Sequence, residues 1–218
     1  MKQVKATIQA APDFDAYAGI VHDKQCYAVN FAYESKTLVL LLLGEREEDA
    51  SLEIRFYNVL GYEMTSCDFW GPSPHVFGWS LVPENESTLL PRFLLKAQEH
   101  DFAQTSLQRN QEYMEIEVQF TSGDTLTVLC CSIDIQQKRY TCPCCGWLTY
   151  RVPASQDHGY ICPVCFWEND SFITGDLQPS DSNHGLTLNQ ARMNYRTIGA
   201  VEQSTLPHVR LPLECERL

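Results

Sequence analysis

Cysteine is the residue type with the most evident chemistry in this sequence of 218 residues. Cys142 and Cys145 form one Cys-x-x-Cys pair, Cys162 and Cys165 form a second, and 16 residues separate the two pairs. Two tight turns that each present two thiolates at this spacing are typical of a four-thiolate zinc site. The spacing therefore predicts one zinc ion bound by Cys142, Cys145, Cys162 and Cys165.

The residues around the pairs suit such turns. A proline follows the first cysteine of each pair, and Gly146 follows Cys145; both fit a turn whose backbone N–H groups point at sulfur. Cys144 competes for a place, but the interval from Cys142 to Cys145 matches the second pair, so we expect Cys144 to be a spectator. Because four protein thiolates leave no open position for water, the metal should hold structure and not catalyse.

Other interpretations of the cysteines stay open. Four thiolates also make a rubredoxin-like iron site, and aromatic neighbours could shield one, but Phe166 stands where a second glycine is expected, which favours zinc. A redox Cys-x-x-Cys normally opens a helix in a βαβ pattern, whereas the flanks here are strand-like, which argues against redox chemistry. His158 or His184 could replace a cysteine ligand, although each also fits a loop histidine with local hydrogen bonds.

Acidic residues outnumber basic ones in both parts of the chain. The net charge is −12, with 11 basic and 20 acidic residues up to Arg139 and 5 basic and 8 acidic residues after it. Nucleic-acid binding usually needs a basic stripe, and the sequence has no Lys/Arg cluster longer than the pair at 138–139. The charge therefore argues against nucleic-acid and acidic-membrane partners, and it fits either plain solubility or attraction to a basic protein partner.

The remaining cysteines and the apolar runs bear on location. Residues 1–15 lack the apolar core of a signal peptide, and the longest apolar run, Leu38–Leu43, is shorter than the roughly 20 residues that span a bilayer. We therefore expect a cytoplasmic protein with reduced thiols. Structural roles without disulfides are expected for five cysteines: Cys26, Cys67, Cys130, Cys131 and Cys215.

Strands are the main element expected before the cysteine pairs. Short runs rich in branched or aromatic residues predict strands at Val4–Gln9, Tyr27–Tyr33, Thr37–Leu43, Leu52–Val59 and Tyr62–Phe69. A hairpin is expected from Tyr113 to Ile135, turning at residues 122–124. Its return strand changes apolar phase at Cys130-Cys131, which a β-bulge would explain.

Two helices complete the expected elements. Ser87 or Thr88 could cap a helix over Arg92–Glu99. Thr187 with Gln190 forms a capping box for a second helix, whose apolar stripe should pack on the zinc turns or on the sheet. Gly199 is expected to end that second helix.

Two surface features are candidates for recognition. Cys67–Trp79, which includes the Asp68 to His75 segment, is interrupted by glycine and prolines and is expected to be an ordered loop. Its Trp70, His75 and Trp79 could form a binding surface, or their rings could pack beneath the loop. The acidic run Glu45, Glu47, Glu48 and Asp49 could attract a basic partner, or it could be a solvated turn after a strand.

Three motifs together carry a resemblance to a known family. TCPCCGWLTY, YICPVCFWEND and NHGLTLNQARMNYRTIGA follow one another in the C-terminal third, and in combination they resemble the cysteine-rich CPCC domain family over about residues 139–212. The resemblance implies a bacterial source and metal binding by the paired cysteines, without an established activity. The acidic, β-rich part before these motifs is similar in character to immunity proteins of bacterial toxin systems.

The sequence thus predicts an α+β protein. A β-rich domain over residues 1–138, a sandwich or partly open barrel, should precede a zinc-ribbon-like module with one helix over residues 139–218. The expected function is that of a non-enzymatic bacterial zinc-binding protein that acts in protein–protein interaction, with an immunity-type role as its specific form. The alternative is an enzyme with its cleft in the N-terminal domain and a purely structural zinc, although no catalytic motif is evident.

Overall fold

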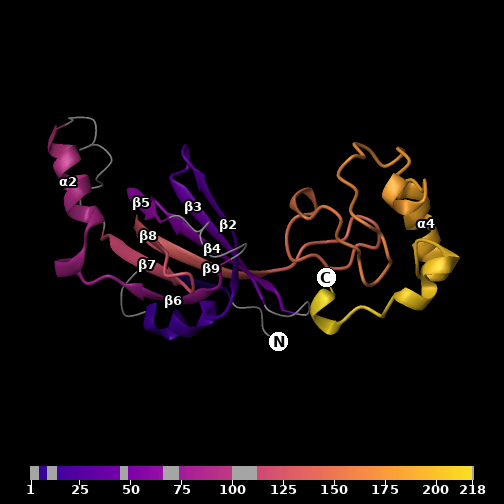
Figure 1. The fold of residues 1–218 in the computed structure, drawn as a ribbon, viewed down its shortest axis with the longest axis horizontal. Helices are drawn as coiled ribbons and strands as arrows, with labels where there is room; N and C mark the ends of the chain where they lie inside the picture. The colour runs from indigo at the N-terminus through magenta and orange to yellow at the C-terminus, as the bar shows by residue number, and fades with distance from the viewer. Residues whose placement is uncertain (1–4, 9–13, 45–48, 66–73, 100–111, 218) are drawn as a thin grey trace. The chain divides into compact units, whose positions relative to one another are not determined.

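The computed structural model describes residues 5–8, 14–44, 49–65, 74–99 and 112–217 (Figure 1). The chain divides into two compact units, Lys2–Gln137 and Lys138–Leu218. The first unit is built on antiparallel sheets, and the second carries the cysteine cluster and one α-helix, which confirms the α+β class. Within the described ranges, no helix has the length and apolar character needed to cross a membrane.

Two antiparallel sheets make up the N-terminal unit. The five-stranded sheet has the order β1-β9-β4-β3-β2, and the four-stranded sheet has the order β5-β8-β7-β6. The strands are β1 (Lys5–Ile8), β2 (Gln25–Ala32), β3 (Thr37–Leu43), β4 (Ser51–Tyr57), β5 (Gly61–Met64), β6 (Val76–Leu81), β7 (Met114–Phe120), β8 (Thr125–Cys130) and β9 (Ser132–Lys138).

The two sheets are joined by bent segments of chain. β4 leads into β5 and β8 leads into β9, while β4 pairs with β9 in one sheet and β5 pairs with β8 in the other. At this bend the Cys131 N–H donates to the Tyr57 carbonyl at 3.0 Å. A bridge between Gln25 and His75 also links β2 to β6. The sheets therefore have features of the partly open barrel that was one of the two expected architectures.

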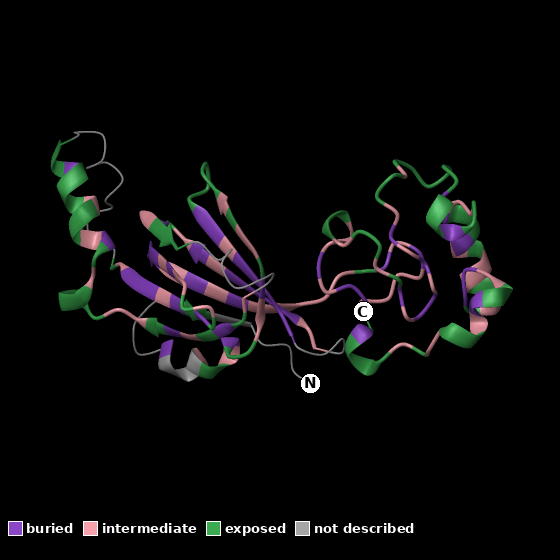
Figure 2. Cartoon of the chain, in the orientation of Figure 1, coloured by how far each residue is buried: buried purple, intermediate pink, exposed green. Residues whose placement is uncertain are grey.

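The core of this unit lies between the sheets. Apolar side chains that alternate along the strands are buried there, and Leu38, Leu40 and Leu42 of β3 are all 0% exposed. Figure 2 shows these buried stretches along the strands. A side chain of this size contributes about 1.5–3 kcal/mol when fully buried, so β3 anchors the unit.

The phase change at Cys130-Cys131 has a different cause from the one expected. The chain leaves the four-stranded sheet after Cys130 and enters the five-stranded sheet at Ser132. The buried face therefore switches because the strand changes sheets, and no bulge within one ladder is needed. Both cysteines are buried. Burial is the main cause that raises the pKa of the Cys130 thiol, and the electrostatic effect of the neighbouring Cys131 is the second.

The expected loop over Cys67–Trp79 is partly wrong. Residues from Val76 onward form β6, and Trp79 is buried, with its indole N–H donating to the Tyr17 carbonyl at 3.2 Å. Trp79 is thus a core residue and not part of a recognition loop. Residues 66–73, with Cys67 and Trp70, and residues 45–48 of the acidic run lie outside the described residues.

Helix α2 (Leu89–Glu99) begins earlier than the expected Arg92. Its first turn is capped by Glu115 of β7, whose carboxylate accepts from the N–H groups of Thr88 and Leu89, both at 3.1 Å, and from the Ser87 hydroxyl. A carboxylate at a helix N-terminus stabilises the helix because it pairs with unsatisfied N–H groups. The Ser87 hydroxyl also accepts from the Leu90 N–H at 3.4 Å, so Ser87, one of the two expected caps, does lie at the helix start, and Glu115 completes the cap from a distant part of the sequence.

Candidate metal centre

The C-terminal unit presents its cysteine pairs on two short turns. Its regular structure is α4 (Leu188–Ile198) with short 3-10 segments, η3 (Ala154–Gln156), η4 (Asp181–Asn183), η5 (Gln203–His208) and η6 (Glu214–Glu216). Isolated bridges join Tyr140 to Tyr150 and Ile161 to Glu168. Each bridge brackets one Cys-x-x-Cys pair, so each pair occupies a turn between two bridged segments.

Backbone hydrogen bonds fix the first turn, which we call the first knuckle (residues 142–147). The Cys142 N–H donates to the Trp147 carbonyl at 2.8 Å, and the Gly146 N–H donates to the Cys142 carbonyl at 3.0 Å. These two bonds close the turn without using either thiol. The sulfurs of Cys142 and Cys145 therefore remain available to a ligand.

The second knuckle (residues 162–167) repeats the same two bonds. The Cys162 N–H donates to the Trp167 carbonyl at 2.9 Å, and the Phe166 N–H donates to the Cys162 carbonyl at 2.8 Å. Gly146 and Phe166 occupy equivalent positions, with φ of 81° and 69°. Phe166 thus adopts the left-handed backbone that its glycine counterpart reaches without strain.

Substitution of Gly146 should destabilise the first knuckle. A Cβ meets no atom within 4 Å there, but φ is 81°, and a left-handed L-residue costs about 1 kcal/mol. We expect Gly146→Ala to lower the free energy of unfolding of the C-terminal unit by about that amount in denaturant titrations of the metal-loaded protein. Gly175→Ala is the matched control, because that site also has open space and its φ lies outside the left-handed region. Equal stability of the two variants would contradict the expectation.

The four sulfurs of the two knuckles gather in one place. All four lie within 4.8 Å of one another, and the two short contacts, Cys142 to Cys165 and Cys145 to Cys162, are both 3.7 Å between sulfurs. A disulfide would need about 2.0 Å. Two sulfurs on one tetrahedral zinc, with Zn–S of about 2.3 Å, lie about 3.8 Å apart. The donor set and its spacing therefore fit a four-thiolate metal ion.

The sulfur cluster is enclosed, and the Thr149 hydroxyl lies within hydrogen-bond distance of one of its sulfurs. Cys142, Cys162 and Cys165 are at most 1% exposed, and the Thr149 hydroxyl lies 3.3 Å from the Cys162 sulfur. Hydrogen bonds among the four thiols, first of all those with Cys142, lower the pKa of Cys162 and raise the pKa of Cys145 and of Cys165. A bound metal would require the thiolate form of all four. Thr149 was not expected from the sequence, because a threonine near a cysteine pair carries no distinguishing pattern.

Helix α4 holds the knuckles from outside. The Trp147 indole N–H donates to the Tyr195 hydroxyl at 2.7 Å, and Arg192 Nε donates to the Pro143 carbonyl at 3.0 Å. The helix begins with the expected capping box at Thr187 and ends at Gly199 with φ of 83°. Its stripe packs on the knuckles, which was one of the two expected surfaces.

The other candidate ligands lie outside the sulfur group. Cys144 is buried, and its thiol hydrogen-bonds with Cys165, but its sulfur is not one of the four. His184 pairs with Glu202 at 2.9 Å, and His158 is exposed. The structure thus brings together the four cysteines chosen from the sequence, and their role as metal ligands stays a prediction. None of the nine described cysteines forms a disulfide.

Comparison with known proteins gives one family match. A family model described as "Cysteine-rich CPCC" matches residues 140–216. No curated protein matches the sequence. The crystal structure of an uncharacterized protein from Neisseria gonorrhoeae is similar over 61% of this chain and 96% of its own, with 13% identity and a TM-score of 0.33. The C-terminal third thus matches the cysteine-rich CPCC family, as its motifs predicted, and the residues before it match no family model.

Proposed function

We propose that the chain binds one zinc ion through Cys142, Cys145, Cys162 and Cys165, and that this ion keeps the C-terminal unit folded. The observation that carries the proposal is the gathering of four sulfurs at distances that suit a single tetrahedral ion. The buried cluster of this unit is itself built around these cysteines. A small unit of this kind needs a metal or another crosslink, because its apolar core is limited.

Zinc is preferred to iron because closed four-thiolate sites on paired turns are typical structural zinc sites. The test is elemental analysis of full-length protein purified without chelator from cells supplied with both metals. We expect one zinc per chain and a colourless protein. Stoichiometric iron with visible absorption would assign a rubredoxin-like site instead, and absence of bound metal would contradict metal binding altogether.

The second part of the proposal concerns the N-terminal unit, which we infer binds a basic protein. Residues 2–137 contain nine basic and 20 acidic residues, a net charge of −11, whereas residues 138–218 contain seven and eight. An acidic surface speeds encounter with a basic partner and loses this effect as salt is added. Neutralisation of a bacterial toxin, as by an immunity protein, is the specific form of this role. A partner whose association rate is independent of salt would contradict it.

A closed four-thiolate site offers no position for substrate, so the proposed zinc has a structural role. Catalysis would have to come from the N-terminal unit, as in the enzyme alternative. Turnover of a small molecule by full-length protein, without any protein partner, would favour that alternative.

A further inference from the structure

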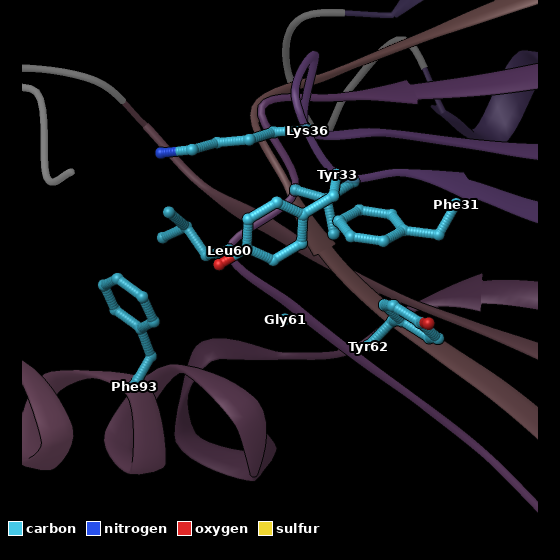
Figure 3. Close-up of a pocket in the computed structure, with 8 residues that line it drawn as sticks. Phe31, Tyr33, Lys36, Leu60, Gly61, Tyr62 and Phe93 are labelled. Atoms are coloured by element: carbon cyan, nitrogen blue, oxygen red, sulfur yellow. The ribbon is translucent and has the colours of Figure 1, made fainter. Parts of the chain in front are cut away.

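An aromatic hollow lies on the surface of the N-terminal unit (Figure 3). Its volume is about 390 Å³, and its lining comes from the end of β2, the turn after it, the bend between β4 and β5, and helix α2. Figure 3 shows the rings of Tyr33 and Phe93, the side chain of Leu60 and the stem of Lys36 around one space. The lining is mainly apolar and carries one cation, Lys36.

The aromatic rings of this hollow are unusually exposed. Tyr33 is 86% exposed and Tyr62 is 43% exposed. The Phe31 ring is 5.1 Å from that of Tyr62 and 6.3 Å from that of Tyr33, measured between centroids. Grouped exposed aromatic side chains are typical of protein-binding surfaces, where tyrosine and phenylalanine are enriched.

Helix α2 is fixed against the same part of the sheet. Arg92 of α2 pairs with Glu63 of β5, and the cap from Glu115 holds the first turn of the helix. Phe93 therefore follows directly after two attachments of the helix, the cap at its first turn and the Arg92–Glu63 ion pair. This makes the aromatic wall a formed surface and not a chance approach of loops.

β5 borders the hollow and is an end strand of its sheet. Directly after β5, the Thr65 N–H donates to the carbonyl of Thr125, the first residue of β8. Because ladder bonds in an antiparallel pair fall on every second residue, the N–H and C=O groups of Tyr62 and Met64 point away from β8. No described strand pairs with that outer side. An open edge of this kind can accept an added strand.

We propose that the outer edge of β5 and the adjoining hollow bind an extended segment of a basic partner protein. The segment adds as a strand beside Tyr62 and Met64 and places a large apolar side chain among Tyr33, Tyr62 and Phe93. This proposal rests on the proposed function, because the charge of −11 on this unit favours a basic partner and disfavours a second copy of the same chain.

Lys36 determines which side chain of the segment enters the hollow. Its ammonium group is the cation of the lining, and it would repel a lysine or arginine placed beside it. The basic residues of the segment therefore lie outside the hollow, over the acidic surface, and an apolar residue enters it. The expected binding sequence combines one large apolar anchor with flanking lysine or arginine.

The test uses a displayed library of random peptides of about ten residues, long enough for one strand. The library is selected on the full-length, metal-loaded protein at low salt, and enriched peptides are synthesised and their Kd measured by fluorescence anisotropy. Tyr33→Ala removes an anchor ring, and Met64→Pro removes an outward N–H without touching the β8 ladder. Each should weaken binding by about tenfold or more.

Two control variants separate the site from general damage. Met64→Ala keeps the outward N–H and should change Kd by less than about twofold, as should Phe77→Ala, which removes an exposed ring on β6. Melting temperatures of all four variants should match that of the wild type in circular dichroism. If a proline variant is unstable, Tyr33→Ala alone decides the result.

The outcomes distinguish the site from the proposed function. Peptides that bind in a salt-dependent manner but bind Tyr33→Ala and Met64→Pro as tightly as wild type would overturn the site and leave the proposed function standing. Salt-independent peptides that lose affinity for both variants would support the site and contradict the charge-based function. A library without enrichment would overturn the site, and so would a dimer of the chain that Met64→Pro abolishes in sedimentation.

Discussion

Replacing Cys162 by serine should unfold the C-terminal unit and leave the N-terminal unit folded. Cys162 is 0% exposed, and its sulfur lies 3.7 Å from that of Cys145 and 3.3 Å from the Thr149 hydroxyl. A serine hydroxyl is a poor zinc ligand, and metal binding contributes on the order of 10 kcal/mol of apparent folding free energy in small zinc modules. Each unit has its own buried apolar cluster, so the loss should be confined to one of them.

Hydrogen exchange resolved by peptide and elemental analysis would measure this effect. Amides of residues 138–218 should lose protection in Cys162→Ser, and zinc should be absent, while the strands of the N-terminal unit keep their protection. Cys145→Ser should behave in the same way. Cys144→Ser is the control, since its sulfur lies outside the group of four, and it should retain zinc. A Cys162→Ser protein with full metal content and protected amides would contradict the four-thiolate assignment.

The second large effect is expected at Glu216, whose carboxylate ties down the end of the chain. It is 1% exposed and accepts from the Arg210 guanidinium at 2.7 and 2.8 Å and from the Leu213 N–H at 2.7 Å. Burial raises its pKa, but the hydrogen bonds from Arg210 and Leu213 outweigh burial, so the pKa lies below its usual 4.5. Glu216→Gln should cost about 2–3 kcal/mol, since it removes charge-assisted bonds from a buried group.

The lowered pKa of Glu216 also sets the direction of a pH effect. Its contribution to stability is complete above the unfolded-state pKa, near 4.5, and is lost as pH falls through the folded-state value. The stability difference between wild type and Glu216→Gln should therefore be constant near neutral pH. It should shrink once the pH falls below the unfolded-state pKa. Denaturant titrations at several pH values would measure it, with zinc content followed in parallel because acid also protonates thiolates. A difference that grows on acidification would contradict the assignment.

Local patterns in the sequence predicted the elements that depend on neighbouring residues. The paired spacing located the four cysteines, and the Thr187 capping box located the start of α4. β3 occupies the expected residues Thr37–Leu43, because a continuous branched run has few alternatives to a buried strand. Each of these features follows from a short local pattern: a Cys-x-x-Cys pair, a capping box or a single apolar run.

Features that depend on distant residues could not be predicted in this way. The carboxylate that completes the cap of α2 belongs to Glu115, which lies 26 residues after Leu89. The phase change at Cys130-Cys131 reflects a move between sheets, and Thr149 reaches the Cys162 sulfur only when both knuckles are folded. Single-sequence patterns carry no information on such long-range contacts, so these residues looked ordinary.

The pairing of sulfurs across the two knuckles has a consequence for metal exchange. Each short contact joins a thiol of one knuckle to a thiol of the other, so the proposed ion would be shared by two two-thiol chelates on one chain. An ion released by one knuckle would still be bound by the other knuckle. The thiols of the releasing knuckle would then remain close to the ion, at a high effective concentration. Recapture is then faster than escape, and zinc should leave the protein only when both turns open together.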